Sequence, residues 1–140
     1  MTEGISYFKA MQILPGIYVH QTELKGNGVF TSIALTAGMD VEVSPVIVMT
    51  AEERKLLDQT LLHDYIFEWQ PDGENKCCMA QGYISVYNHS DNANCEYFMD
   101  YDNNTMSVKT MRNIAAGEEL TVNYNGDWNN KKPVWFEVKS

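Results

Sequence analysis

The chain has 140 residues, of which 44% are apolar and 21% are charged. This length supports one ordinary domain with a single core, and the composition is that of a folded protein rather than a disordered one. The net charge is −9 and Lys and Arg form no cluster, which disfavours direct binding to nucleic acid. An acidic surface favours a cationic partner such as a lysine-rich peptide, although an acidic coat that only aids solubility explains the charge equally well.

Membrane and export signals are missing from the sequence. No apolar run is long enough to span a bilayer, so we expect no membrane insertion. The first residues lack the basic and apolar segments of a secretory signal, which predicts an intracellular protein, in the cytosol of a prokaryote or the nucleus of another organism. Cys77, Cys78 and Cys95 are odd in number and lack C-x-x-C spacing, which indicates reduced thiols rather than disulfides or a zinc site.

Short β-rich runs come first along the chain. Residues 17–20 and 28–33 are rich in β-branched and aromatic side chains, which predicts two strands. Residues 46–49 predict a third strand. Pro45 precedes this run and should lie at a sheet edge or at the first strand position, because proline cannot donate a ladder hydrogen bond.

One helix is predicted to begin near Thr50. Thr50 and Glu53 have capping-box spacing, in which each side chain accepts a hydrogen bond from the other residue's backbone N–H. The leucines at positions 56, 57, 61 and 62 form an apolar stripe typical of one helix face. We expect the helix to end around residues 63–64.

The second half of the sequence predicts mostly strands. Residues 65–69 alternate like a strand, and 71–75 form a turn or exposed loop. Residues 95–101 and 105–111 flank a short Asn-rich turn, which predicts a β-hairpin. A final strand is expected over residues 120–124.

The tail after residue 127 is polar but contains three large aromatic side chains, Trp128, Trp135 and Phe136. Such side chains favour a docked tail. We therefore expect one domain over residues 1–140, with a core over about 17–126 and a C-terminal docking segment over about 127–140.

Two polar segments are candidates for ligand binding. Gly26-Asn27-Gly28 would let a backbone approach a ligand closely, although a tight hairpin turn is the commoner reason for such a pattern. Asn88 and His89 begin a dense polar run up to Asn94 that suits the edge of an adenine, although it is also explained by a polar loop. No second His or Cys lies at ligand spacing from His89, so a metal site is not indicated.

Taken together with a third motif, these segments match the pattern of one protein family. Gly-x-Gly at 26–28, Asn88-His89-Ser90 followed by Asn94, and Glu119-Leu120 followed by Tyr124 resemble, in order and spacing, the SET-domain family of protein-lysine N-methyltransferases. The resemblance runs from about residue 17 to residue 138. The end of the chain, with Trp135, is similar to that of small members that lack a zinc-binding C-terminal segment.

The resemblance implies a fold and a reaction. The fold is mainly β, with several small β-sheets, one short helix and a pseudoknot near the C-terminus. The reaction is the transfer of a methyl group from S-adenosylmethionine to the side-chain amine of a lysine in a protein or peptide, which we expect to be basic. Histone tails, ribosomal proteins and other basic chains all fit this description.

The resemblance also assigns roles by position. Gly26, Asn27 and Gly28 would contact the methionine part of the cofactor, Asn88 and His89 would hold its amino group and adenine, and Trp135 would cover the adenine. Tyr124 matches the catalytic tyrosine and also borders the cofactor. Tyr97 matches a tyrosine that lines the lysine channel, and Val122, Tyr83 and Tyr65 would complete the channel walls.

Several positions depart from the family pattern. Asp91 stands where zinc-dependent members have a cysteine, so we expect no metal. Ala93 replaces a usual proline and Asn123 a frequent aspartate. Val122 stands where many members carry the Phe or Tyr that helps to set the number of methyl groups added.

Two departures keep a rival function open. Ala93 and Asn123 leave room for a catalytically silent SET-fold module that binds basic peptides. Tyr124 and Asn88 are intact, which favours the enzyme. A structural β-protein that shares these motifs by chance is a third and remote alternative.

Overall fold

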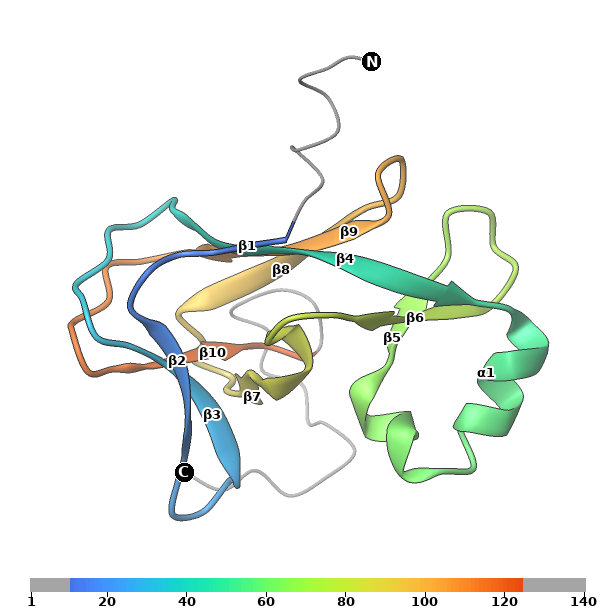
Figure 1. Ribbon diagram of the computed structural model, residues 1–140, viewed down its shortest axis with the longest axis horizontal. Helices are drawn as coiled ribbons and strands as arrows, with labels where there is room; N and C mark the ends of the chain where they lie inside the picture. The colour runs from blue at the N-terminus through green and yellow to red at the C-terminus, as the bar shows by residue number, and fades with distance from the viewer. Residues whose placement is uncertain (1–10, 125–140) are drawn as a thin grey trace.

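The computed structural model describes residues 11–124, which form a mainly β structure with one short α-helix (Figure 1). The strands are β1 (Gln12–Ile13), β2 (Ile17–Gln21), β3 (Asn27–Thr31), β4 (Asp40–Met49), β5 (Phe67–Trp69), β6 (Lys76–Ala80), β7 (Asn88–His89), β8 (Cys95–Asp100), β9 (Thr105–Thr110) and β10 (Glu119–Val122). The helices are α1 (Ala51–Leu57) and the 3-10 turns η2 (Leu61–Tyr65) and η3 (Ile84–Val86). The predicted fold class is therefore confirmed.

The larger sheet has the order β5-β6-β4-β9-β8, with β1 paired to β4 as its sixth strand. The predicted hairpin is present as β8 and β9, with Asn104 in the left-handed region of its turn at φ 52°. β4 extends six residues further toward the N-terminus than the predicted strand over 46–49. Pro45 therefore lies inside the strand rather than at its start. On one side of β4 the neighbouring strand is β1 at Val43 and β6 at Val46. Pro45 lies between these two pairings, where a residue without an N–H donor is tolerated.

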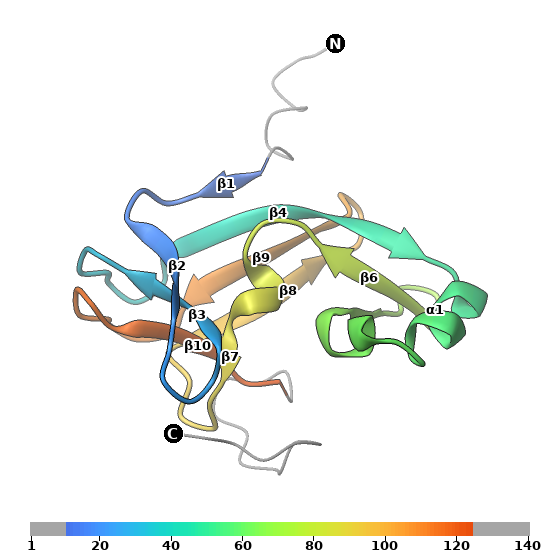
Figure 2. The ribbon, with the colours of Figure 1, turned by 60° about the horizontal axis from the view of Figure 1, so that its bottom comes forward.

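The smaller sheet brings the three motif segments together. Its order is β2-β3-β10-β7, with β10 antiparallel to β3 and parallel to β7. Leu120 pairs with Val29, and Thr121 pairs with Asn88. Figures 1 and 2 show this sheet at the opposite end of β4 from α1. The sheet thus places the glycine turn before β3, the Asn-His pair of β7 and the end of β10 side by side.

Asn94 ties the polar loop after β7 to β10. Its Oδ1 accepts a hydrogen bond from the Thr121 N–H at 2.8 Å, and its Nδ2 donates to the Glu119 carbonyl at 2.8 Å. The Asn94 side chain is 1% exposed. A buried amide that satisfies two strand groups fixes the loop, because a buried unpaired polar group is costly.

The helix begins as predicted but does not pack as its leucines suggested. Thr50 N–H donates to Glu53 Oε1 at 2.9 Å and Glu53 N–H donates to Thr50 Oγ1 at 3.1 Å, which completes the capping box. The helix ends at Leu57, and η2 follows where a longer helix was expected. Leu56 is 68% exposed and Leu61 is 75% exposed, so the predicted apolar stripe does not form a buried helix face. Within residues 11–124, no helix is long and apolar enough to cross a membrane.

Cys77, Cys78 and Cys95 are buried free thiols. The core contains side chains from both sheets, among them Val29, Met106 and Leu120, each 0% exposed. The predicted docking segment over 127–140, Trp135, and the pseudoknot that would involve this segment lie outside the described residues.

Candidate functional site

Two cavities meet at the end of β10. The first, which we call the aromatic channel, has a volume of about 450 Å³, and the second, which we call the glycine cleft, has a volume of about 490 Å³. Asp64, Ser85 and Tyr124 line both cavities. The remaining walls of the glycine cleft are Lys25, Gly26, Asn27, Tyr65, Val86 and Asn88. Two hollows that share three residues offer places for two ligands whose ends meet.

The glycine cleft begins at the turn between β2 and β3. Gly26 has a φ of +74°, a conformation that favours glycine. Its carbonyl accepts from the Thr22 N–H at 2.6 Å and from the Thr22 hydroxyl at 2.8 Å. The Gly-x-Gly segment is therefore both a hairpin turn, the plainer of the two interpretations, and a wall of a cavity.

Gly28 is required by a close approach of side chains from β7 and β10. A Cβ atom added at Gly28 would lie 2.5 Å from Glu119 Oε2 and 2.9 Å from Asn88 Nδ2. Asn88 Nδ2 donates to Glu119 Oε2 at 2.7 Å and to the Asn27 carbonyl at 3.1 Å. Both amide hydrogens of Asn88 are thereby engaged, which leaves Oδ1 to face donors as an acceptor.

His89 organises the backbone beside the cleft. The residue is only 4% exposed, and its Nδ1 accepts from the Tyr124 N–H at 2.9 Å. Burial lowers the pKa of His89, which favours the neutral ring. Because Nδ1 is the acceptor, the proton of the neutral ring is on Nε2. The ring also packs against the Tyr124 ring, with centroids 5.1 Å apart.

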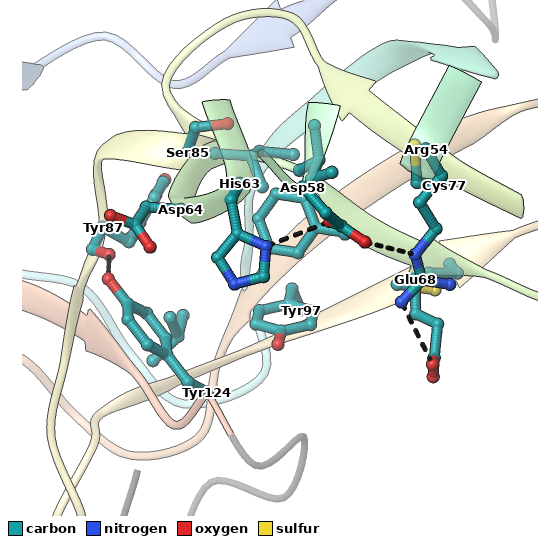
Figure 3. A pocket seen from close by; sticks show the side chains of 15 residues that line it. Arg54, Asp58, His63, Asp64, Glu68, Cys77, Ser85, Tyr87, Tyr97 and Tyr124 are labelled. Carbon is teal, nitrogen blue, oxygen red and sulfur yellow. Dashed lines mark hydrogen bonds and ion pairs between the residues drawn. The ribbon is translucent and has the colours of Figure 1, made fainter. Parts of the chain in front are cut away.

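Tyr124 lines both cavities. The hydroxyl donates to the Tyr87 carbonyl at 2.8 Å (Figure 3). Burial raises the pKa of Tyr124 to about 12, so the side chain is a neutral phenol at physiological pH. A phenol oxygen whose proton is directed to a carbonyl can act toward a ligand only as an acceptor.

The aromatic channel is apolar along its walls and charged at its rim. Phe67 and Tyr97 pack edge to face with ring centroids 5.3 Å apart, and burial raises the pKa of Tyr97 to about 12. Val122 also lines the channel. At the rim, His63 Nδ1 lies 3.0 Å from Asp58 Oδ1 (Figure 3). Such a channel accepts a long apolar stem better than a bulky polar side chain.

Comparisons with known proteins identify the family. The SET domain model matches residues 26–125. The chain belongs to the SET-domain family. It is 36% identical over 120 residues to a Schizosaccharomyces pombe protein named histone-lysine N-methyltransferase, H3 lysine-37 specific, and the match spans 85% of this chain and 76% of that protein. It also resembles the crystal structure of a candidate histone methyltransferase from Plasmodium falciparum, with a TM-score of 0.63 and 30% identity over 83% of this chain and 98% of that one.

The SET-domain prediction is therefore confirmed for the family, the fold and the enzyme class, a protein-lysine methyltransferase. The structure gathers several predicted site residues of this SET domain. Gly26, Asn27, Asn88 and Tyr124 line the glycine cleft, and Tyr97 and Val122 line the aromatic channel with Tyr124. These placements agree in geometry with the predicted roles, which remain predictions.

Other predicted residues lie elsewhere. Tyr65, expected in the channel, lines the glycine cleft. Tyr83 is not among the residues that line either cavity; its N–H donates to the Glu42 carboxylate at 2.8 Å. Gly28 and His89 act behind the cleft wall, through the packing of Asn88 and of the Tyr124 backbone.

Sequence reasoning missed several residues at this site. Lys25 lines the glycine cleft and its Nζ lies 4.0 Å from Glu119 Oε1. Its position directly before the Gly-x-Gly motif could have indicated it. Asp64 and Ser85, which line both cavities, belong to segments without a motif, so only the fold brings them to the junction.

Proposed function

We propose that this SET-domain enzyme transfers methyl groups from S-adenosylmethionine to a lysine of a histone tail. The observation that carries the proposal is a pair of cavities that share Tyr124 as a lining residue. The fission-yeast relative, whose name gives a histone H3 lysine as its substrate, supports the choice of a histone. A histone substrate implies a nuclear location for at least part of the protein.

The residues of the glycine cleft fit the methyl donor. The donor carries a carboxylate, an ammonium group and an adenine, and the cleft offers a Lys25 cation, the Asn88 Oδ1 acceptor and backbone groups of Gly26 and Asn27. A Cβ atom added at Gly26 would meet nothing within 4 Å, so the open side of this glycine leaves room for a ligand. When bound, S-adenosylmethionine supplies a sulfonium that activates the methyl group for displacement.

The aromatic channel would deliver an uncharged lysine amine. A lysine side chain has a reference pKa of about 10.4, and transfer into an apolar environment disfavours its ammonium form. Tyr97, Phe67 and Val122 provide such walls. Water at the rim can accept the proton once the pKa of the amine falls, so no buried general base is needed.

Tyr124 would orient the amine. Its hydroxyl hydrogen is committed to the Tyr87 carbonyl, so its oxygen accepts an amine N–H rather than donating to the nitrogen. The nitrogen lone pair is then left free to point along the channel axis. Holding two reactants in one line in this way is worth up to about 7–11 kcal/mol of barrier.

The charge of the channel rim favours a basic peptide. The carboxylates of Asp58 and Glu68 line the channel at its rim together with the guanidinium of Arg54, and Asp64 lines it where the two cavities adjoin. Arg54 is itself engaged, with Nη2 3.6 Å from Glu68 Oε2. Together with a net charge of −9, this rim would attract cationic residues on either side of the target lysine.

Isotope labelling tests this function. The full chain is incubated with S-adenosylmethionine that carries a labelled methyl group and with purified core histones, and the products are mapped by mass spectrometry. We expect the label on a lysine of histone H3, and histone H3 with arginine at lysine-37 shows whether the site is that of the relative. Binding of S-adenosylmethionine without labelling of any histone would refute the substrate class. Absence of both would favour the silent peptide-binding module.

A further inference from the structure

Glu42 is a buried carboxylate behind the active site with no part in the mechanism above. It lies on β4 and is 1% exposed. An ionisable group is rarely buried unless its polar atoms are satisfied, since the transfer of a carboxylate from water to a protein interior is costly. Its position therefore calls for a physical explanation.

Three donors from two segments converge on this carboxylate. The Ser44 hydroxyl donates to Oε2 at 2.7 Å, and the Tyr83 N–H donates to the same oxygen at 2.8 Å. The Tyr87 hydroxyl donates to Oε1 at 3.0 Å. Gly82, at φ +77°, lies so close that an added Cβ would collide with both the Glu42 carboxylate and the Ser44 hydroxyl. The loop before η3 is thus closed onto Glu42.

Tyr87 links this carboxylate to the reacting end of the site. Its side chain is 1% exposed and its phenol is held by Glu42, while its backbone carbonyl accepts the Tyr124 hydroxyl at 2.8 Å. One residue therefore has its ring fixed in the core and its carbonyl fixed at the Tyr124 hydroxyl. A shift of the ring would move the carbonyl, and with it the Tyr124 oxygen.

We propose that Glu42 is a positioning residue for methyl transfer: by holding the Tyr87 ring it sets the place of the Tyr87 carbonyl, and thereby the direction of the Tyr124 hydroxyl. This proposal rests on the proposed role of Tyr124. Glu42 touches neither ligand and acts only through Tyr87. Burial raises the pKa of Glu42, and the hydrogen bonds from Ser44, Tyr83 and Tyr87 oppose this rise because they favour the ionised form. Such a fully satisfied buried network is rigid.

The chain offers a matched control for this proposal. Ser44 is 0% exposed and also donates to Glu42, but to Oε2, the oxygen that the Tyr83 N–H holds independently. Ser44→Ala therefore removes a buried hydrogen bond of the same carboxylate and leaves the Tyr87 contact in place. A purely structural role for Glu42 predicts similar effects of Ser44→Ala and Glu42→Gln on activity.

The test is a double-mutant cycle with Glu42→Gln and Tyr87→Phe, measured by single-turnover methyl transfer to a histone H3 peptide. In Glu42→Gln the Tyr83 N–H requires the amide oxygen at the Oε2 position, so the amide NH2 faces Tyr87 and the Tyr87 hydroxyl can no longer donate to residue 42. We expect each single variant to lower the rate about tenfold with little change in the Kd for S-adenosylmethionine, and the double variant to be no slower than Tyr87→Phe alone. Ser44→Ala should keep its rate within about twofold even where its Tm falls.

Several results would overturn the proposal. A Tyr87→Phe enzyme with the wild-type rate would do so even if Glu42→Gln fails to fold. Multiplicative effects in the double variant would show that Glu42 does not act through Tyr87. Equal rate losses in Ser44→Ala and Glu42→Gln would reduce Glu42 to a stability residue.

A readout independent of activity separates this proposal from the proposed function. Fluorotyrosine at position 124 should give one sharp ¹⁹F resonance in the wild type and in Ser44→Ala, and a shifted or broadened one in Glu42→Gln. An unchanged resonance in Glu42→Gln would refute the link to Tyr124. If the wild type methylates no histone while the resonance responds as expected, the proposed function fails and the positioning link stands.

Discussion

Replacement of Tyr124 by phenylalanine tests the central geometry of the site. The change removes the phenol oxygen of a residue that lines both cavities and leaves the ring packed against His89. Among the contacts of the described residues, it deletes the hydrogen bond from the hydroxyl to the Tyr87 carbonyl at 2.8 Å. The loss of one such bond costs about 1 kcal/mol of folding free energy, which corresponds to a fall in Tm of about 4 °C for a domain of this size.

The effect on turnover should be much larger. A preorganised polar group that faces the reacting atoms in a dry site contributes about 10²–10³-fold to the rate, or about 2.7–4 kcal/mol. Since a domain with about 5–15 kcal/mol of stability stays folded after losing about 1 kcal/mol, unfolding cannot account for such a rate loss. We therefore expect Tyr124→Phe to slow methyl transfer about 10²–10³-fold with an almost unchanged Kd for the cofactor.

Two measurements decide the outcome. Single-turnover kinetics with labelled S-adenosylmethionine give the rate of the chemical step, and calorimetry gives the affinity of the free enzyme for the cofactor. Loss of binding in parallel with turnover would make Tyr124 a structural residue of the glycine cleft. A rate within a factor of about 3 of the wild type would remove the hydroxyl from the reaction, because it corresponds to less than about 0.7 kcal/mol of barrier.

Three further predictions concern binding, stability and pH. Gly28→Ala should weaken S-adenosylmethionine binding at least about tenfold in calorimetry, because the new methyl group displaces Asn88 and Glu119. Gly38→Ala is the control: it is strained at φ +85° but lies in open space, so it should lower Tm and leave the affinity unchanged. Leu61→Gln should change the free energy of unfolding by less than about 0.5 kcal/mol in urea titrations, and Met106→Ala, at 0% exposure, should cost about 2–5 kcal/mol. Burial raises the pKa of Tyr124 from 10.0 to about 12, so the folded state keeps a phenol proton that the unfolded chain releases at lower pH. The free energy of unfolding of the wild type should therefore fall as the pH rises from 10.0 to about 12. Tyr124→Phe should show a shallower fall.

Local signals in the sequence predicted the local structure well. Thr50 and Glu53 gave the helix start, since a capping box depends on contacts three residues apart. The Asn-rich turn gave the β8–β9 hairpin for the same reason. The spacing of Leu56 and Leu61 predicted one apolar helix face, but both side chains are exposed. Helical spacing does not show whether another element covers that face.

The sequence by itself determined the family and the reaction, through the motifs Gly26 to Gly28, Asn88-His89 and Tyr124. Of these residues, Gly26, Asn27, Asn88 and Tyr124 line the glycine cleft. Only the tertiary structure decided how they work together. The parallel pairing of β10 with β7 places Tyr124 against His89 and the Tyr87 carbonyl, and the closure of the loop at Gly82 places Glu42 behind them. Glu42 and Tyr87 are 45 positions apart, and such a contact leaves no periodicity or spacing in the sequence, because it depends on which strands pair and on where a buried charge can find its donors.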